Sequence, residues 1–202
     1  VLGAGVGVGT VLAIGGAPIW VTLFTVVIRR RRPDRITMIG QALSITGAAL
    51  LVLSGGPEAS TLSGIILSIL AGAAYAAYST ITSKISGAAP SVTIAAATFG
   101  VAAVLVAPVF FVAPVGWALA PSPLALLLFL GVVVTGLSYA LYTKGLKTVP
   151  AASAVTLALA EPLTAWLLAT FLVGEANTPA RMAGAALLIA GLYVVSRARP
   201  AS

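Results

Sequence analysis

One acidic side chain lies deep inside a long apolar segment and is the first candidate for chemistry. Glu161 follows Pro150 by 11 residues and precedes Val173 by 12, so it is about 16–18 Å from either end of a helix over that segment. An ionisable group inside a membrane costs about 2.5–3.5 kcal/mol and is a functional candidate by default. Thr164 shares its side of the helix. Proton coupling or substrate contact is one interpretation of Glu161; a neutral, hydrogen-bonded carboxyl at the helix break expected from Pro162 is the other.

Two stripes of hydroxyl groups are the next candidates. Tyr75 and Tyr78 share one helix face, and Ser138 and Tyr139 share another. A tyrosine combines an apolar ring with a hydrogen-bonding tip, which suits amphipathic substrates. Lining of a cavity and hydrogen bonding between helices stay open as alternatives. The candidate substrate-binding residues are Tyr75, Tyr78, Ser138, Tyr139, Glu161 and Thr164.

The remaining chemistry is sparse. The sequence has no histidine and no cysteine, and its acids are Asp34, Glu58, Glu161 and Glu175, each in a different segment. This pattern offers no metal cluster, no catalytic triad and no carboxylate pair at catalytic spacing. We therefore expect no enzyme activity, no metal and no cofactor. A membrane-embedded enzyme or a structural subunit is a remote alternative.

The composition indicates which kind of structure positions these residues. Hydrophobic residues make up 60% of the 202 and charged residues 7%, with a mean hydropathy of +1.14, whereas soluble domains carry about 25% charged residues. Lipid offers no partner to backbone polar groups, so spanning segments are helices or closed barrels. The alternation of polar and apolar residues typical of barrel strands is absent. An all-α, polytopic membrane protein follows, whose net charge of +7 reflects membrane topology rather than binding of nucleic acid.

Charges and turn residues divide the chain into seven spans of the length that a bilayer needs. The predicted spans are roughly Gly5–Ile28, Ile36–Leu53, Leu62–Ser83, Val92–Val112, Leu124–Thr143, Ala151–Val173 and Pro179–Ser196. Asp34 and Thr178 are predicted N-caps, and Pro179 is predicted to begin the last helix.

Basic residues in the loops predict the orientation. One side holds Arg29, Arg30, Arg31, Arg32, Arg35, Lys84, Lys144, Lys147, Arg197 and Arg199. The other side holds Arg181 alone. Because cytoplasmic loops collect Lys and Arg, we expect the first side and the C-terminus to be cytoplasmic, in a plasma (inner) membrane.

A shift of 144 residues aligns the first two spans with the last two without a gap. Matching pairs include Val11/Val155, Pro18/Pro162, Met38/Met182, Gly40/Gly184 and Gly47/Gly191. The paired spans are five apart, an odd number, so they enter the membrane in opposite directions. Inverted repeats of this kind are typical of secondary transporters. The glycines, seven residues apart in each pair, predict smooth faces for close helix packing.

The end of the chain resembles the EamA-type repeat of the drug/metabolite transporter superfamily. The resemblance is carried by the Tyr139–Tyr142 segment, Glu161-Pro162, Gly174-Glu175 and the helix with Gly184 and Gly191, and by Leu62–Lys84 as an opening helix. It implies a ten-helix carrier of two inverted five-helix repeats. Residues 62–199 would form the complete second repeat and residues 1–56 the last two helices of a truncated first repeat.

The first repeat departs from the family pattern. Ala17 replaces the acid before Pro18, and Arg30-Arg31 replace Gly-Glu. We expect a secondary transporter, an exporter of small metabolites such as amino acids or drug-like compounds. A nucleotide-sugar or sugar-phosphate exchanger of the same superfamily is the alternative. The expected partners are a small-molecule substrate and the lipid bilayer, not nucleic acid, and proton coupling and a homodimer stay open.

Overall fold

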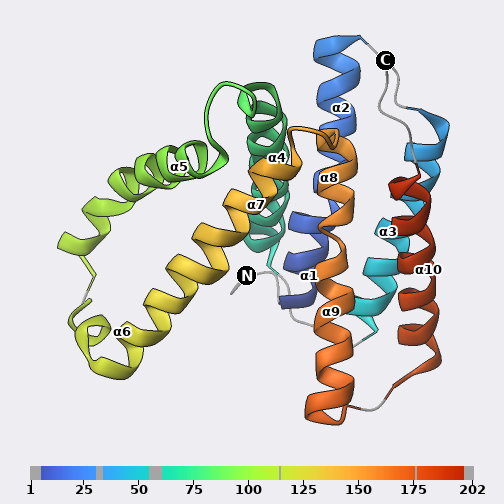
Figure 1. The fold of residues 1–202 in the computed structure, drawn as a ribbon. Coiled ribbons are helices and arrows are strands. Elements are labelled where there is room, and N and C mark those ends of the chain that lie inside the picture. Colours follow the sequence, from blue (N-terminus) through green and yellow to red (C-terminus); the bar gives the residue numbers. More distant parts are fainter. Residues whose placement is uncertain (1–5, 31–33, 55–60, 114, 176, 198–202) are drawn as a thin grey trace. The chain divides into compact units, whose positions relative to one another are not determined.

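The chain folds almost entirely into helices (Figure 1). The computed structural model describes residues 6–30, 34–54, 61–113, 115–175 and 177–197. Within this part, 7 segments are long and apolar enough to cross a membrane: Val8–Val27, Arg35–Leu53, Leu62–Ile85, Ser91–Phe111, Pro121–Gly145, Ala151–Val173 and Pro179–Ser196. The seven predicted spans are confirmed, and the bounds of the last two are identical. The chain is a polytopic helical membrane protein.

The chain divides into two compact units, Val1–Ile81 with Val149–Ser202 and Thr82–Thr148. The first unit contains α1 (Val6–Thr10), η1 (Val11–Gly15), α2 (Ala17–Arg29), α3 (Arg35–Leu53), most of α4 (Leu62–Ile85), α8 (Ala151–Leu157), α9 (Ala160–Leu168), η5 (Ala169–Val173) and α10 (Pro179–Ser196). The second contains the end of α4, α5 (Ser91–Val106), η2 (Ala107–Phe111), η3 (Gly116–Leu119), α6 (Pro121–Leu128), η4 (Phe129–Leu137) and α7 (Ser138–Gly145).

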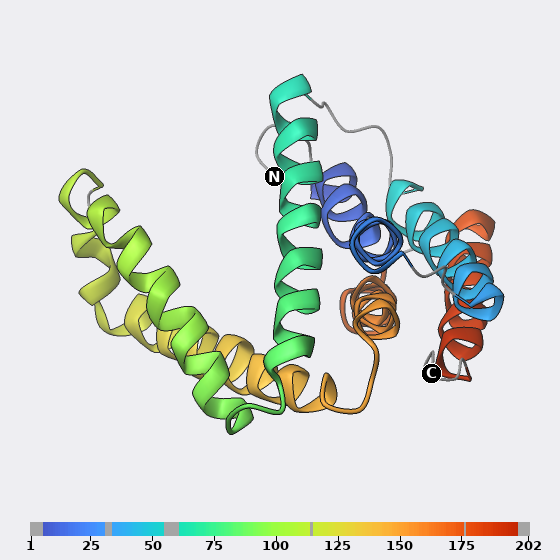
Figure 2. The same cartoon turned by 90° about the horizontal axis from the view of Figure 1, so that it is seen from above.

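Helices α3 and α10 pack backbone against backbone (Figures 1 and 2). A Cβ atom added at Gly47 would lie 2.7 Å from the carbonyl oxygen of Gly184, and one added at Gly184 would lie 2.9 Å from that of Gly47. Gly40 and Gly191 face each other in the same way, at 3.1 and 2.8 Å. The predicted close packing of the four glycines is confirmed. The two helices run antiparallel, because the partner number falls from 191 to 184 as α3 advances from 40 to 47.

Two spans are broken at the equivalent prolines. A π-helical turn, η1, precedes Pro18, and turn residues 158–159 separate α8 from α9 just before Pro162. Proline has no N–H and its ring clashes with the preceding turn, so a regular α-helix cannot continue through either position. Each span therefore consists of two half-helices.

Two small cores hold the half-helices in place. Ala17 and Val21 of α2, Ala76 of α4 and Val155 of α8 form one. The other contains Ala48 and Leu51 of α3, Leu159, and Ala185 and Leu188 of α10. Because lipid tails are as apolar as these side chains, close packing rather than exclusion of water holds the helices together.

The predicted starts of α3 and α10 are confirmed. Thr178 caps α10, since its Oγ1 accepts a hydrogen bond from the backbone N–H of Arg181 at 3.2 Å, and Pro179 begins the helix. Asp34 is the N-cap residue of α3, as predicted, although its side chain makes no capping hydrogen bond. Arg31, Arg32 and Arg199 of the predicted basic face lie outside the described residues.

The second unit is held by contacts between α5 and α7. The rings of Phe99 and Tyr139 meet edge to face, with centroids 4.8 Å apart. Large apolar side chains of this unit are exposed, including Leu105 of α5 at 75% and Phe111 of η2 at 90%. Exposed apolar surface of this extent is expected where a bilayer, not water, surrounds the helix.

Candidate functional site

Glu161 lies in the first turn of α9, immediately after the helix break. Its backbone N–H donates to the carbonyl oxygen of Ala158 at 3.0 Å, which belongs to the turn that ends α8. An acidic side chain is favourable in a first turn because the helix dipole places positive partial charge there. Its neighbour Pro162 is buried, but Glu161 itself is exposed. The break thus turns a mid-span carboxyl outward from the packed core of the first unit.

Thr164 is exposed one turn further along α9, and its hydroxyl is already engaged. Its Oγ1 donates to the carbonyl oxygen of Ala160 at 2.9 Å. Thr25, Thr80, Thr98 and Thr156 make the same bond to the carbonyl four residues back, at 2.7–2.9 Å. The bond satisfies the donor while leaving oxygen lone pairs accessible. Thr164 can therefore still accept a hydrogen bond beside Glu161.

Tyr75 and Tyr78 lie on α4 in the first unit, and both are half-buried. Tyr75 packs against the core formed by α2, α4 and α8, as Trp20 and Phe24 do. The rings of Trp20 and Phe24 are themselves 6.0 Å apart. Tyr75 and this aromatic pair thus pack on the same core, and all three side chains stay partly exposed.

Ser138 and Tyr139 lie in the second unit, where the π-helical η4 passes into α7. Ser138 is exposed, and its hydroxyl donates to the carbonyl of Val133 at 3.4 Å. Tyr139 is half-buried between Phe99 and Tyr142, whose ring centroid is 6.4 Å away. The six candidate residues therefore divide as four in the first unit and two in the second.

A buried polar contact that the sequence analysis overlooked joins α2 to α3. Thr22 Oγ1 donates to Gln41 Oε1 at 3.0 Å. Gln41 is 6% exposed, and its Nε2 atom makes no hydrogen bond within the described residues. Ser44, one turn along α3, is fully buried, and its Oγ likewise has no partner there. That hydroxyl instead fills the space that a side chain at Gly191 would need.

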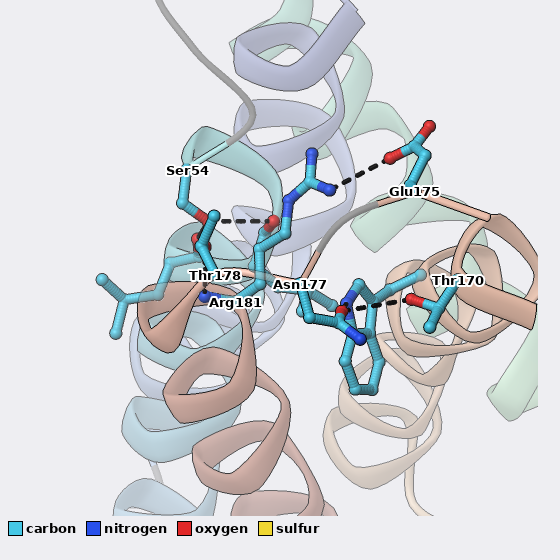
Figure 3. A network of polar contacts seen from close by, with 9 residues as sticks. Ser54, Thr170, Glu175, Asn177, Thr178 and Arg181 are labelled. Atoms are coloured by element: carbon cyan, nitrogen blue, oxygen red, sulfur yellow. Dashed lines mark hydrogen bonds and ion pairs between the residues drawn. The ribbon is translucent and has the colours of Figure 1, made fainter.

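A second overlooked contact lies at the far end of α9, where Asn177 approaches η5 (Figure 3). Asn177 Oδ1 accepts from Trp166 Nε1 at 2.9 Å and from Thr170 Oγ1 at 3.2 Å. The sequence did hold a signal for both contacts. Gln41 is the only glutamine of the chain and Asn177 its only asparagine, and side-chain amides are favoured as hydrogen-bonding partners between membrane helices.

An ion pair lies beside this second contact. Arg181 donates from an η nitrogen to Glu175 Oε2 at 3.0 Å, and the two side chains are 20% and 48% exposed (Figure 3). Exposed ion pairs contribute little to stability. The pair lies at the end of a span, where charged side chains can reach water and cost little free energy.

Metal binding finds no support in the described part of the chain. No group of three or more potential acidic, histidine or cysteine ligands occurs there. The candidate residues provide hydrogen-bonding groups, one carboxyl group and aromatic surface. Such groups can bind and release a small molecule.

Known proteins resemble the chain along most of its length. Residues 62–197 match the EamA-like transporter family. An uncharacterized transporter, YwfM, of Bacillus subtilis is 37% identical, over 96% of this chain and 66% of that protein. An uncharacterized transporter of Archaeoglobus fulgidus is 29% identical, over 90% and 64%. An uncharacterized inner membrane transporter, YicL, of Salmonella typhimurium is 26% identical, over 83% and 57%.

A solved structure has the same fold. Its TM-score is 0.78 at 20% identity, with 96% of this chain and 69% of that one covered. The chain spans 57–66% of the length of the curated relatives it matches.

Proposed function

Because this chain belongs to the EamA-like transporter family, we propose that it carries small metabolites, such as amino acids or drug-like compounds, across a membrane as part of a secondary exporter. The family match and the relatives' names support transport, and the candidate residues support the kind of substrate. One mid-span carboxyl, hydroxyls and aromatic rings suit a small amphipathic molecule.

The observation that carries the proposal is the symmetry of the α3–α10 contact. A shift of 144 residues converts the pair Gly40 and Gly191 into the pair Gly184 and Gly47, and both pairs face each other. The same shift relates the breaks at Pro18 and Pro162. We therefore assign residues 1–56 to the last two helices of one repeat and residues 62–199 to an inverted second repeat. Carriers built in this way bind their substrates between the repeats, near mid-membrane.

Transport itself is tested with the complete carrier reconstituted in liposomes. A panel of radiolabelled amino acids, other small metabolites and cationic dyes should yield at least one compound with saturable flux. Empty liposomes and liposomes with heat-inactivated carrier are the controls. Saturable flux restricted to sugar phosphates or nucleotide sugars would contradict the proposed substrate class, and no flux for any class would contradict the exporter.

The proposed binding role of the two deeper tyrosines gives a separate prediction. Tyr75→Phe and Tyr139→Phe each remove one hydroxyl and keep the ring. Because a neutral hydrogen bond contributes about 0.5–1.5 kcal/mol, each change should raise the apparent KM about twofold to tenfold, with little effect on thermal stability. Tyr193→Phe, at an exposed position of α10, is the matched control. Unchanged KM for every transported compound would assign both hydroxyls to packing alone.

The proposed orientation can be tested by labelling single cysteines with a membrane-impermeant maleimide. Lys147→Cys lies after α7, and Ala120→Cys lies between η3 and α6, on the opposite side of one span. With the C-terminus cytoplasmic, intact cells should label position 120 and not position 147. The reverse pattern would invert the topology without affecting the fold.

A further inference from the structure

The donors of the two overlooked hydrogen bonds occupy equivalent places in the proposed repeats, whereas the acceptors, Gln41 and Asn177, are not related by the repeat. Thr22 and Trp166 are 144 residues apart, the same shift that relates Pro18 to Pro162. Each lies four residues after its proline, on the half-helix that follows the break. Each donates its hydrogen bond to the only side-chain amide of its type in the chain, Gln41 or Asn177.

The two bonds lie toward opposite sides of the membrane. Helix α2 and the α9–η5 segment end the first and sixth spans, and consecutive spans alternate in direction. Figure 1 shows α2 and α9 extending from the middle of the first unit toward opposite ends. One bond ties α2 to the neighbouring helix α3 on the predicted cytoplasmic side. The other, on the outer side, ties α9 to Asn177, the residue directly before the N-cap of α10.

Both half-helices cover part of a core. Beyond the break, α2 packs through Val21 against α4 and α8. In the same way α9 packs through Leu163 and Trp166 against the core that contains Ala185 of α10. A half-helix that swings at its break would uncover these positions. The break supplies the hinge, because backbone hydrogen bonding is already interrupted there.

We propose that Thr22–Gln41 and Trp166–Asn177 are a pair of latches, one on each side of the membrane. Each bond, while formed, holds its half-helix, α2 or α9–η5, in the closed position. The two bonds break in alternation, so that one half-helix opens while the other stays closed. The proposal rests on the transport function proposed above. It adds the residues that set the balance between the inward-open and outward-open states.

The inner latch is built to open at low cost. Gln41 accepts from Thr22 through Oε1, but its buried Nε2 has no partner within the described residues. An unsatisfied buried donor destabilises the closed arrangement. The outer latch is better satisfied, because both Trp166 and Thr170 donate to Asn177. The two latches thus differ in the chemistry of donor and acceptor, while their donors Thr22 and Trp166 hold equivalent positions.

The test measures accessibility and requires no substrate. In a background without other cysteines, Ala152→Cys reports on opening of α2, because Ala152 of α8 packs against the core that α2 covers. Ala185→Cys, 4% exposed, reports on opening of α9–η5. Impermeant maleimide is applied to inside-out and right-side-out vesicles of the complete carrier, and rates of labelling are compared.

Thr22→Val removes the donor of the inner latch and keeps the side-chain shape. Labelling of position 152 from the cytoplasmic side should rise about threefold to tenfold, the shift that one interhelical hydrogen bond in a membrane supports. Labelling of position 185 should stay constant or fall. Thr25→Val is the matched control, because Thr25 bonds only the carbonyl of Val21 in its own helix. Thr22→Ser restores a hydroxyl and should restore the low rate.

Trp166→Phe removes the indole donor of the outer latch. Labelling of position 185 from the outer side should rise by a similar factor, with Trp117→Phe in η3 as the matched control. If Trp166→Phe fails to accumulate in the membrane, Asn177→Ala removes the acceptor instead and should have the same effect.

Three results would overturn the latches. These are rates equal to those of the matched controls, a response of only one of the two latch variants, or a rise at both reporters in one variant, which indicates general loosening. None of these results bears on transport. Flux in liposomes is measured separately. The labelling results can therefore contradict the latches while flux supports the proposed exporter, and an absence of flux can contradict the exporter while labelling still supports the latches.

Discussion

Replacing Gly47 by alanine should lower the free energy of unfolding by about 3 kcal/mol, at the upper end of the range for overpacked cores. The added Cβ atom would overlap the backbone nitrogen of Leu188 and lie 2.7 Å from the carbonyl oxygen of Gly184. Backbone atoms cannot rotate away as the tip of a side chain can. Helices α3 and α10 must therefore separate, and the loss of van der Waals contact is large because packing holds these helices together.

The measurement is reversible unfolding of the complete carrier in mixed detergent micelles, followed by tryptophan fluorescence. Gly100→Ala is the matched control, since nothing lies within 4 Å of a Cβ atom there. The control should be neutral or stabilising by up to about 1 kcal/mol, because alanine is the better helix former. Equal stability of the two variants would contradict the tight interface.

A double substitution sharpens this prediction. Gly184→Ala alone should be about as costly as Gly47→Ala, because its Cβ would lie 2.7 Å from the backbone nitrogen of Leu51. Once the first alanine has separated the helices, the second adds little. The double variant should therefore lose clearly less than the sum of the single losses, as expected for residues in contact. Additive losses would show that the two glycines act independently.

Replacing Glu161 by glutamine should remove the dependence of flux on a proton gradient while substrate exchange continues. Glutamine keeps the shape of the side chain and its hydrogen bonding, but it cannot gain or lose a proton. A gradient of one pH unit stores about 1.4 kcal/mol per proton, enough for about a tenfold accumulation of substrate at one proton per cycle. The variant should lose this accumulation entirely.

The experiment compares wild type and variants in liposomes with and without an imposed pH gradient. Glu175→Gln is the matched control, because Glu175 pairs with Arg181 at the end of a span and lies far along the chain from the break. It should keep the gradient dependence. If Glu161→Gln kept it as well, Glu161 would be a hydrogen-bonded brace at the break rather than a coupling group.

Local sequence determined the spans and the break at Pro162. A membrane span is a local property, because every backbone polar group must be satisfied within its own helix. Apolar length was therefore sufficient to locate all seven, and Pro162 located the break in the sixth span without knowledge of any neighbour. The equivalent break before Pro18 was not predicted. The 144-residue repeat likewise needed only the order of residues. Sequence also placed Asp34 at the N-cap of α3, but not the direction of its side chain, which makes no capping hydrogen bond.

Which faces meet was decided only by the tertiary structure. Membrane helices that are apolar on every side lack the polar face that orients a helix in a soluble protein, so their rotation cannot be read from periodicity. Rotation is set instead by small residues and a few hydrogen bonds between distant segments. Gly47 and Gly184, or Thr22 and Gln41, meet only after the chain has folded. For the same reason Glu161 could be located along its helix from sequence, but its exposure could not, because exposure depends on which side of α9 packs against α3 and α10.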